Sequence, residues 1–161
     1  MKYRGHIVDI TARQVYDGEL TVEDGVISSI TPSDDVEAGA PYFLPGFIDS
    51  HVHIESSMMV PAEFARVAVE QGTVGVVADP HEIGNVLGKE GVEFMINSGK
   101  HIRFNFCFGA PSCVPSCGTD IETSGATLDS RDIEELMARR DIGYLGEMMN
   151  FPGVLAGDKE V

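Results

Sequence analysis

The chain has 161 residues, of which 43% are hydrophobic and 23% are charged, as in ordinary globular proteins. Its formal net charge is −15, so nucleic-acid phosphates would repel it, and we expect no nucleic-acid partner. No run approaches the ~18 apolar residues of a transmembrane helix, so we expect no membrane partner either. The first residues lack a signal-peptide core, and three loosely spaced cysteines do not suggest a secreted disulfide framework. These features predict a cytoplasmic protein.

The first forty residues have the pattern of short strands. Apolar residues recur along residues 17–30, and Asp24-Gly25 lies between two strand-like runs, which is a strong signal for a β-hairpin. Residues 33–40 are small, polar and acidic, as in a linker. We therefore expect residues 1–44 to form an N-terminal β segment, about half of a small β domain.

The pattern changes at Pro45-Gly46, where strands begin to alternate with helices. This alternation predicts consecutive βα units and a parallel sheet, an α/β fold. Asp129 or Ser130 is the predicted N-cap of the last helix. The predicted strands are residues 47–54, 73–78, 102–108 and 142–145, and the predicted helices are residues 61–71, 90–97 and 130–140.

Two histidines, His51 and His53, stand at the end of the first of these strands. Alternate residues of a strand share a face, so both imidazoles would converge, and neutral imidazole is a favoured ligand of transition metals. Glu147 follows the fourth strand, and functional groups of parallel α/β folds gather beyond the C-terminal strand ends. The three residues predict a divalent-metal site. The alternative is two hydrogen-bonded histidines and an ordinary surface glutamate.

Two short segments carry further polar side chains close to strand ends. Asp79, His81 and Glu82 close the second strand, where they either belong to the site or form a turn that Asp79 caps. Glu55 and Ser56 follow the histidine pair, where they either line a substrate pocket or cap the next helix. We take all five as candidate substrate-binding residues.

The cysteines suggest a second kind of metal site, which the spacing argues against. Cytidine-type zinc deaminases combine His-x-Glu with a later Pro-Cys-x-x-Cys. The chain contains His53-Ile54-Glu55, but three residues separate Cys113 from Cys117, and Ser112 stands where the proline would be. We therefore expect free thiols in the loop after the third strand.

Four motifs, in order, resemble those of the adenine deaminases within the amidohydrolase superfamily. The first contains the stretch Pro-Gly-Phe-Ile-Asp-x-His-x-His that the superfamily shares, and the later ones are more specific. Together they extend over about residues 45–154. The first, second and fourth motifs are residues 45–59, 78–88 and 146–154, and the third consists of residues 111–115 and 122–126.

The resemblance implies that residues 45–161 form the first part of an amidohydrolase (β/α)8 TIM-like barrel, about four βα units. A closed barrel typically needs about 250 residues. Residues 1–44 would belong to a composite β-sandwich domain. The implied metal ligands are His51, His53 and Glu147, and Glu147 would also be catalytic as the carboxylate that bridges two metal ions.

The implied reaction is the hydrolysis of adenine to hypoxanthine and ammonia, a step of purine salvage. The implied cofactor is a binuclear centre of manganese or iron, with zinc as a further option. Metal-activated hydroxide would attack the purine carbon that carries the amino group. The family's remaining ligands and its proton-handling aspartate belong to later strands, so we expect this chain to be an incomplete, inactive catalyst by itself.

Two other functions stay open. The chain could belong to another amidohydrolase, which acts on a cyclic amide or on a different aminated ring. It could also be a non-catalytic metal-binding or assembly module. An open half-barrel exposes an unpaired parallel edge, so we expect a homo-oligomer.

Overall fold

The computed structural model describes residues 1–161. The chain divides into two compact units, Met1–Pro45 and Gly46–Val161, and each is described here by itself. None of the helices combines the length and the hydropathy that crossing a lipid bilayer requires.

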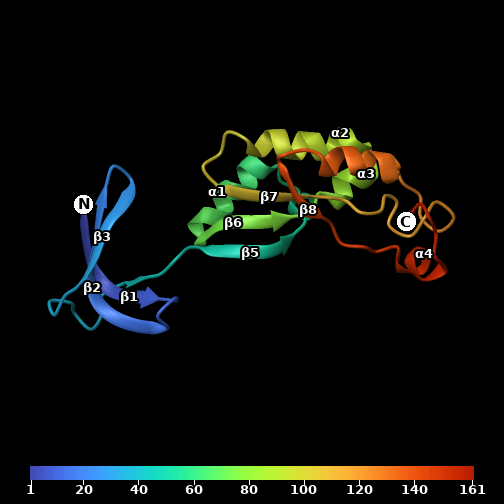
Figure 1. The fold of residues 1–161 in the computed structure, drawn as a ribbon. Helices are drawn as coiled ribbons and strands as arrows, with labels where there is room; N and C mark the ends of the chain where they lie inside the picture. Colours follow the sequence, from blue (N-terminus) through green and yellow to red (C-terminus); the bar gives the residue numbers. More distant parts are fainter. The chain divides into compact units, whose positions relative to one another are not determined.

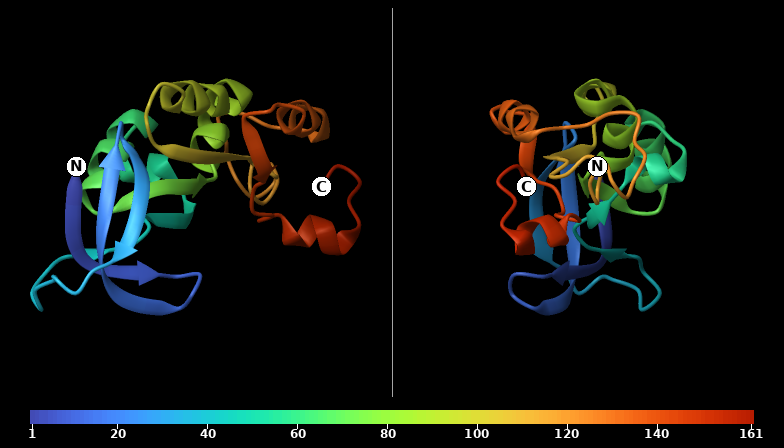
Figure 2. Two further views of the ribbon diagram at one scale, coloured as in Figure 1. Left: turned by 60° about the vertical axis from the view of Figure 1, so that its left-hand side comes forward. Right: turned by 90° about the vertical axis from the view of Figure 1, so that its right-hand side faces the viewer.

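The unit Met1–Pro45 is a four-stranded sheet in the order β3-β2-β1-β4, in which only β4 runs parallel to its neighbour, β1. The predicted hairpin is confirmed, because β2 and β3 join at Asp24 and Gly25, whose φ angles of 51° and 78° suit a two-residue turn. The longer strands curve along their length (Figures 1 and 2). The strands are β1 (Lys2–Asp9), β2 (Gln14–Glu23), β3 (Val26–Pro32) and β4 (Tyr42–Phe43).

The unit Gly46–Val161 contains a parallel sheet in the order β5-β6-β7-β8. Its strands are β5 (Phe47–Val52), β6 (Thr73–Ala78), β7 (Asn105–Ala110) and β8 (Ile142–Leu145). Its helices are η1 (Ile54–Ser57, a 3-10 turn), α1 (Pro61–Glu70), α2 (His81–Gly99), α3 (Ser130–Met137) and α4 (Phe151–Ala156).

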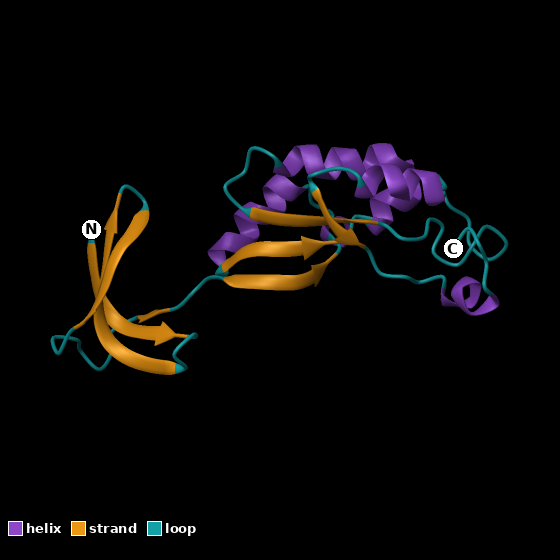
Figure 3. Ribbon diagram, in the orientation of Figure 1, coloured by secondary structure: helices purple, strands orange, loops and turns teal.

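The sheet of this unit has its strands in sequence order, and α1, α2 and α3 lie over one face of it (Figures 1 and 3). A doubly wound fold would place helices on both faces, whereas a (β/α) barrel keeps them all outside. The fold is therefore that of an incomplete (β/α) barrel. The barrel is not closed, because β5 and β8 are both edge strands.

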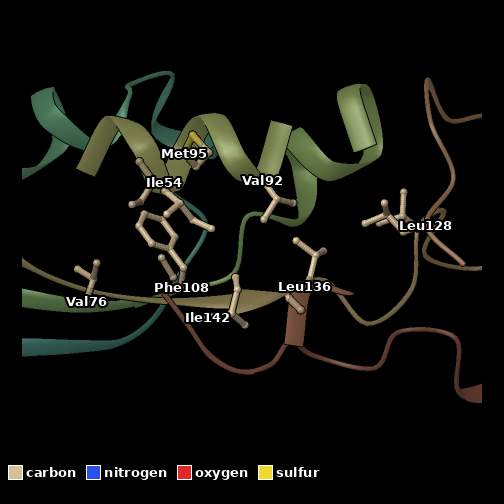
Figure 4. Close-up of a cluster of buried hydrophobic side chains, with 12 residues drawn as sticks. Ile54, Val76, Val92, Met95, Phe108, Leu128, Leu136 and Ile142 are labelled. Carbon is tan, nitrogen blue, oxygen red and sulfur yellow. The ribbon is translucent and has the colours of Figure 1, made fainter. Parts of the chain in front are cut away.

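The hydrophobic core fills the space between the sheet and its helices (Figure 4). Val92 and Met95 of α2 pack with Phe108 of β7 and Leu136 of α3, and each of these side chains is at most 4% exposed. At the start of α3, Asp129 is the N-cap, one of the two predicted candidates, since its side chain accepts hydrogen bonds from the backbone amides of residues 131 and 132. This packing holds the strand ends, and the residues that follow them, in fixed positions.

The structure corrects several predicted boundaries: β5 ends at Val52 rather than at residue 54, and α3 ends at Met137 rather than at residue 140. Helix α2 begins at His81 rather than at residue 90, and it contains a kink at Gly88, whose φ of 61° is non-helical. Glycines weaken a local helix signal, but Gly84 packs closely against Pro111, so tertiary contacts favour the helix. Strand β7 begins at Asn105 rather than at residue 102, and α4 was not predicted.

Candidate metal centre

The predicted site residues gather at the C-terminal ends of the four parallel strands. His51 lies near the end of β5, and His53 follows that strand directly. Asp79 follows β6, and Glu147 lies two residues beyond β8. Because the strands are parallel, these segments meet at one edge of the sheet although the chain separates His53 from Glu147 by 94 positions.

Three side chains at this edge bring nitrogen and oxygen donors together. The Nε2 atoms of His51 and His53 are 3.2 Å apart, and Glu147 Oε1 lies 3.0 Å from His53 Nε2 and 3.7 Å from His51 Nε2. Metal–nitrogen bonds of 2.0–2.1 Å at tetrahedral angles would place two donors about 3.3 Å apart. The observed spacing therefore suits a shared metal ion.

The protonation of His53 supports this fit. Its Nδ1 lies 2.8 Å from the backbone carbonyl oxygen of Asp79, which can only accept, so Nδ1 carries the proton. In a neutral imidazole the Nε2 lone pair then faces the Glu147 carboxylate, which is also an acceptor. Two acceptors in contact repel each other unless a cation lies between them. The donor set therefore fits a divalent cation.

The electrostatics of the site point the same way. Burial of the His53 ring disfavours its charged form, but the hydrogen bond to Asp79 and the charges of Glu82, Asp79 and Glu147 outweigh burial. The pKa of His53 consequently lies above its usual value. The negative potential that favours a proton here also favours a metal cation.

The cluster is open on one side, since the side chains of His51 and Glu147 are 53% and 42% exposed. Three protein ligands leave coordination positions for water, substrate or further ligands. A pocket of about 200 Å³ adjoins the cluster, whereas two larger hollows in the molecule contain none of the predicted site residues. The pocket is lined by His53, His81, Glu82, Asn85, Ser116, Glu122, Glu147 and Met149.

The other predicted residues have different surroundings. Glu82 lies in the pocket with Oε2 3.2 Å from His53 Nδ1, and its Oε1 accepts a 2.7 Å hydrogen bond from the Ser56 hydroxyl. Glu55 accepts the backbone amide of Ile83 in the first turn of α2, and its burial raises the pKa of the Glu55 carboxyl. Glu55 thus caps α2 and not α1, the helix that directly follows it in sequence.

Asp79 and His81 are buried, with 1% and 3% of their surface exposed. The Asp79 carboxylate does not cap the following turn, because its Oδ2 accepts the backbone amide of Glu147 at 3.1 Å and faces His81 Nδ1 at 3.3 Å. Ser112 was not among the predicted site residues, but its hydroxyl donates to the backbone carbonyl of Glu147. Its position just after β7 is the signal that could have identified it.

Cys113 and Cys117 are free thiols in the loop after β7, as predicted, and Cys107, which is also free, lies on β7 itself. They do not contribute to the metal cluster, which consists of His51, His53 and Glu147.

Comparison with known proteins assigns this chain to a family. The sequence profile of the amidohydrolase family matches residues 42–159. The chain belongs to the amidohydrolase family. Members of this family are generally metal-dependent, and the cluster of His51, His53 and Glu147 is the candidate centre of this amidohydrolase.

Curated relatives of this amidohydrolase chain carry the name adenine deaminase. The protein of Salinibacter ruber is 52% identical over 157 residues, which are 98% of this chain and 28% of the relative. That of Methanosarcina acetivorans is 51% identical over 161 residues, 99% of this chain and 28% of the relative. That of Borreliella afzelii is 47% identical over 160 residues, with shares of 99% and 29%. The chain therefore spans less than a third of the length of these relatives.

Proposed function

We propose that this chain is the N-terminal part of an adenine deaminase, which converts adenine and water to hypoxanthine and ammonia. The observation that carries the proposal is the convergence of His51, His53 and Glu147 within 4.8 Å of one another at the strand ends. The proposed substrate, adenine, comes from the names of relatives that are about half identical to nearly the whole of this chain.

We further propose that the cofactor is a pair of divalent ions, manganese or iron, with zinc as the alternative. His51 and His53 would hold one ion through their Nε2 atoms, and Glu147 would be a ligand of both ions. When bound, such a metal supplies Lewis-acid activation of water at neutral pH.

The chain's own residues would bind and orient the purine. Glu82 projects into the pocket beside the cluster, where the Ser56 hydroxyl holds one of its oxygens and leaves the carboxylate facing His53. A carboxylate accepts hydrogen bonds only, so it suits the N–H groups of an aminopurine. We therefore keep Glu82 and Ser56 as substrate-binding candidates. Glu55 has the position of a helix cap, and Asp79 and His81 are buried beneath the ligands.

We also propose that Met1–Pro45 is part of a composite β-sandwich domain and that Gly46–Val161 forms the first part of a (β/α)8 barrel. In the first unit, an apolar groove leaves Ile10, Ile27 and Leu44 between 48% and 65% exposed. An apolar sheet face is stable only when another layer covers it. The longer chains of the relatives would contain such a layer.

The test is ammonia release from adenine with added Mn²⁺. It compares the 161-residue chain with a protein that contains this chain and reaches the length of the relatives. We expect activity only from the longer protein. If neither protein releases ammonia although both fold and bind metal, adenine is the wrong substrate. Activity on a cyclic amide or another aminated ring would then favour the second function, and inactivity on a whole panel would favour a non-catalytic module.

A further inference from the structure

We propose that Asp79 and His81 are positioning residues, a buried pair that holds His53 and Glu147 in the geometry of metal ligands. The inference rests on the metal-binding part of the proposed function. It assigns these two residues a role behind the ligands rather than in contact with substrate.

Asp79 contacts both ligand-bearing segments through different atoms. Its backbone carbonyl accepts the Nδ1–H of His53 at 2.8 Å, and its carboxylate Oδ2 accepts the backbone amide of Glu147 at 3.1 Å. Its backbone amide also donates to the carbonyl of Val52 at 3.1 Å. One residue after β6 therefore ties the segment after β5 to the segment after β8.

His81 fixes the Asp79 carboxylate in this position. The His81 ring is almost completely buried, with Nδ1 3.3 Å from Asp79 Oδ2 and Nε2 2.6 Å from the backbone carbonyl of Cys113. The Asp79 carboxylate and the Cys113 carbonyl both accept hydrogen bonds, so each ring nitrogen of His81 has an acceptor opposite it and is placed to donate. Because Cys113 follows β7, this ring connects the end of β7 to the ends of β5, β6 and β8.

The packing around Asp79 indicates that a contribution to stability alone does not explain why a carboxylate is buried at this position. Its second oxygen, Oδ1, is buried without a hydrogen-bond partner, and an unsatisfied buried acceptor destabilises a fold. The first oxygen is in close contact with Gly146, where an added Cβ would lie 2.5 Å from Oδ2. The buried Asp79 carboxylate destabilises the fold, and the glycine at position 146 leaves room for it. Its position is therefore better explained by the ligand-bearing segments that it holds in place.

Residues that orient metal ligands typically change metal affinity by about 10–100-fold when they are replaced. We therefore expect Asp79→Asn to weaken Co²⁺ binding by that factor and to shift the visible absorption of bound Co²⁺, which reports ligand geometry. A purely structural role would lower stability without changing that spectrum.

The matched control is Asp141→Asn. Asp141 also forms a carboxylate–cation pair, with Arg139 at 2.9 Å, but it precedes β8, whereas Glu147 follows that strand. We expect this variant to lose stability while its Co²⁺ affinity and spectrum match those of the wild type. Circular dichroism reports whether each variant is folded. If Asp79→Asn does not fold, the His81→Gln variant is measured in its place, and we expect its Co²⁺ affinity to be about tenfold weaker than that of the wild type.

The outcomes are separable. Wild-type affinity and spectrum in the folded Asp79→Asn or His81→Gln variant would overturn the inference, as would an equal loss of affinity in Asp141→Asn. A wild-type chain that takes up no Co²⁺ would overturn the metal proposal and, with it, this inference. Deamination of adenine enters none of these measurements, so a wrong substrate leaves the result intact.

Discussion

The Nδ1 atom of His53 lies 2.8 Å from the backbone carbonyl oxygen of Asp79, and this contact determines which ring nitrogen of His53 faces Glu147. A carbonyl cannot donate, so the proton stays on Nδ1 and the Nε2 lone pair is directed at the cluster. The backbone that follows β6 thus orients His53, a ligand that follows the neighbouring strand β5.

If this cluster is the metal site, replacing both histidines should abolish divalent-metal binding. We expect His51→Ala with His53→Ala to retain no Mn²⁺ after dialysis, because a single carboxylate is left as a ligand. Elemental analysis measures the metal content. His101→Ala is the matched control, since His101 is exposed and lies outside the cluster. Unchanged metal content in the double variant would rule the assignment out.

The buried pair of Asp79 and His81 should make stability depend on pH. Burial disfavours the imidazolium, but the hydrogen bond and charge of Asp79, with the carbonyl of Cys113, outweigh it and raise the pKa of His81 from 6.5 to about 9. A pKa that is raised in the folded state contributes stability that is fully present below pH 6.5 and is lost as the pH rises through 9. The contribution is at most on the order of 3 kcal/mol.

Urea unfolding of the metal-free chain at several pH values between 6 and 10 would check this (a range of about 4 units that brackets both pKa values). The wild type should lose more stability across that range than His81→Gln, which cannot titrate at this position. Parallel curves for the two proteins would contradict the prediction.

Gly146→Ala should disturb the cluster through Asp79. The added Cβ would lie 2.5 Å from Asp79 Oδ2 and 2.9 Å from the carbonyl oxygen of Ala110, so the backbone before Glu147 must move. We expect a loss of about 1–3 kcal/mol in unfolding free energy and weaker Mn²⁺ binding. Gly39→Ala, where an added Cβ would meet nothing within 4 Å, is the control. Wild-type stability and affinity in Gly146→Ala would refute the close approach.

Leu136→Ala should destabilise the second unit by about 2–5 kcal/mol, because this core side chain is 0% exposed and its truncation leaves a cavity beneath α3. Leu155→Ala removes the same atoms from a side chain that is 83% exposed, so it should change stability little. Urea denaturation of both variants measures the difference in unfolding free energy. Equal losses in the two variants would show that the Leu136 side chain is not packed in the core.

The 161-residue chain should associate with itself. Strands β5 and β8 each pair with only one neighbour, and such parallel edges present unpaired backbone groups to other chains. Light scattering at several concentrations measures the effect, and a monodisperse monomer would count against it.

The local sequence determined much of the architecture. Alternating strand and helix patterns, the Asp24-Gly25 turn and a helix cap at Asp129 or Ser130 all depend on interactions within a few residues, so the sequence could predict them, and the structure selects Asp129 as the cap. The shared direction of His51 and His53 is also local, because strand residues two apart lie on one face.

Only the tertiary structure decided which distant groups meet those residues. Sequence position left Glu147 as either a ligand or a surface glutamate. The parallel sheet that runs from β5 through β6 and β7 to β8 places its carboxylate beside His53. The same holds for Glu55, which caps α2 rather than the helix next in sequence, and for Asp79, whose carboxylate bonds to Glu147 rather than to its own turn. Hydrogen-bond partners across strand ends depend on sheet register and burial, which no local pattern encodes.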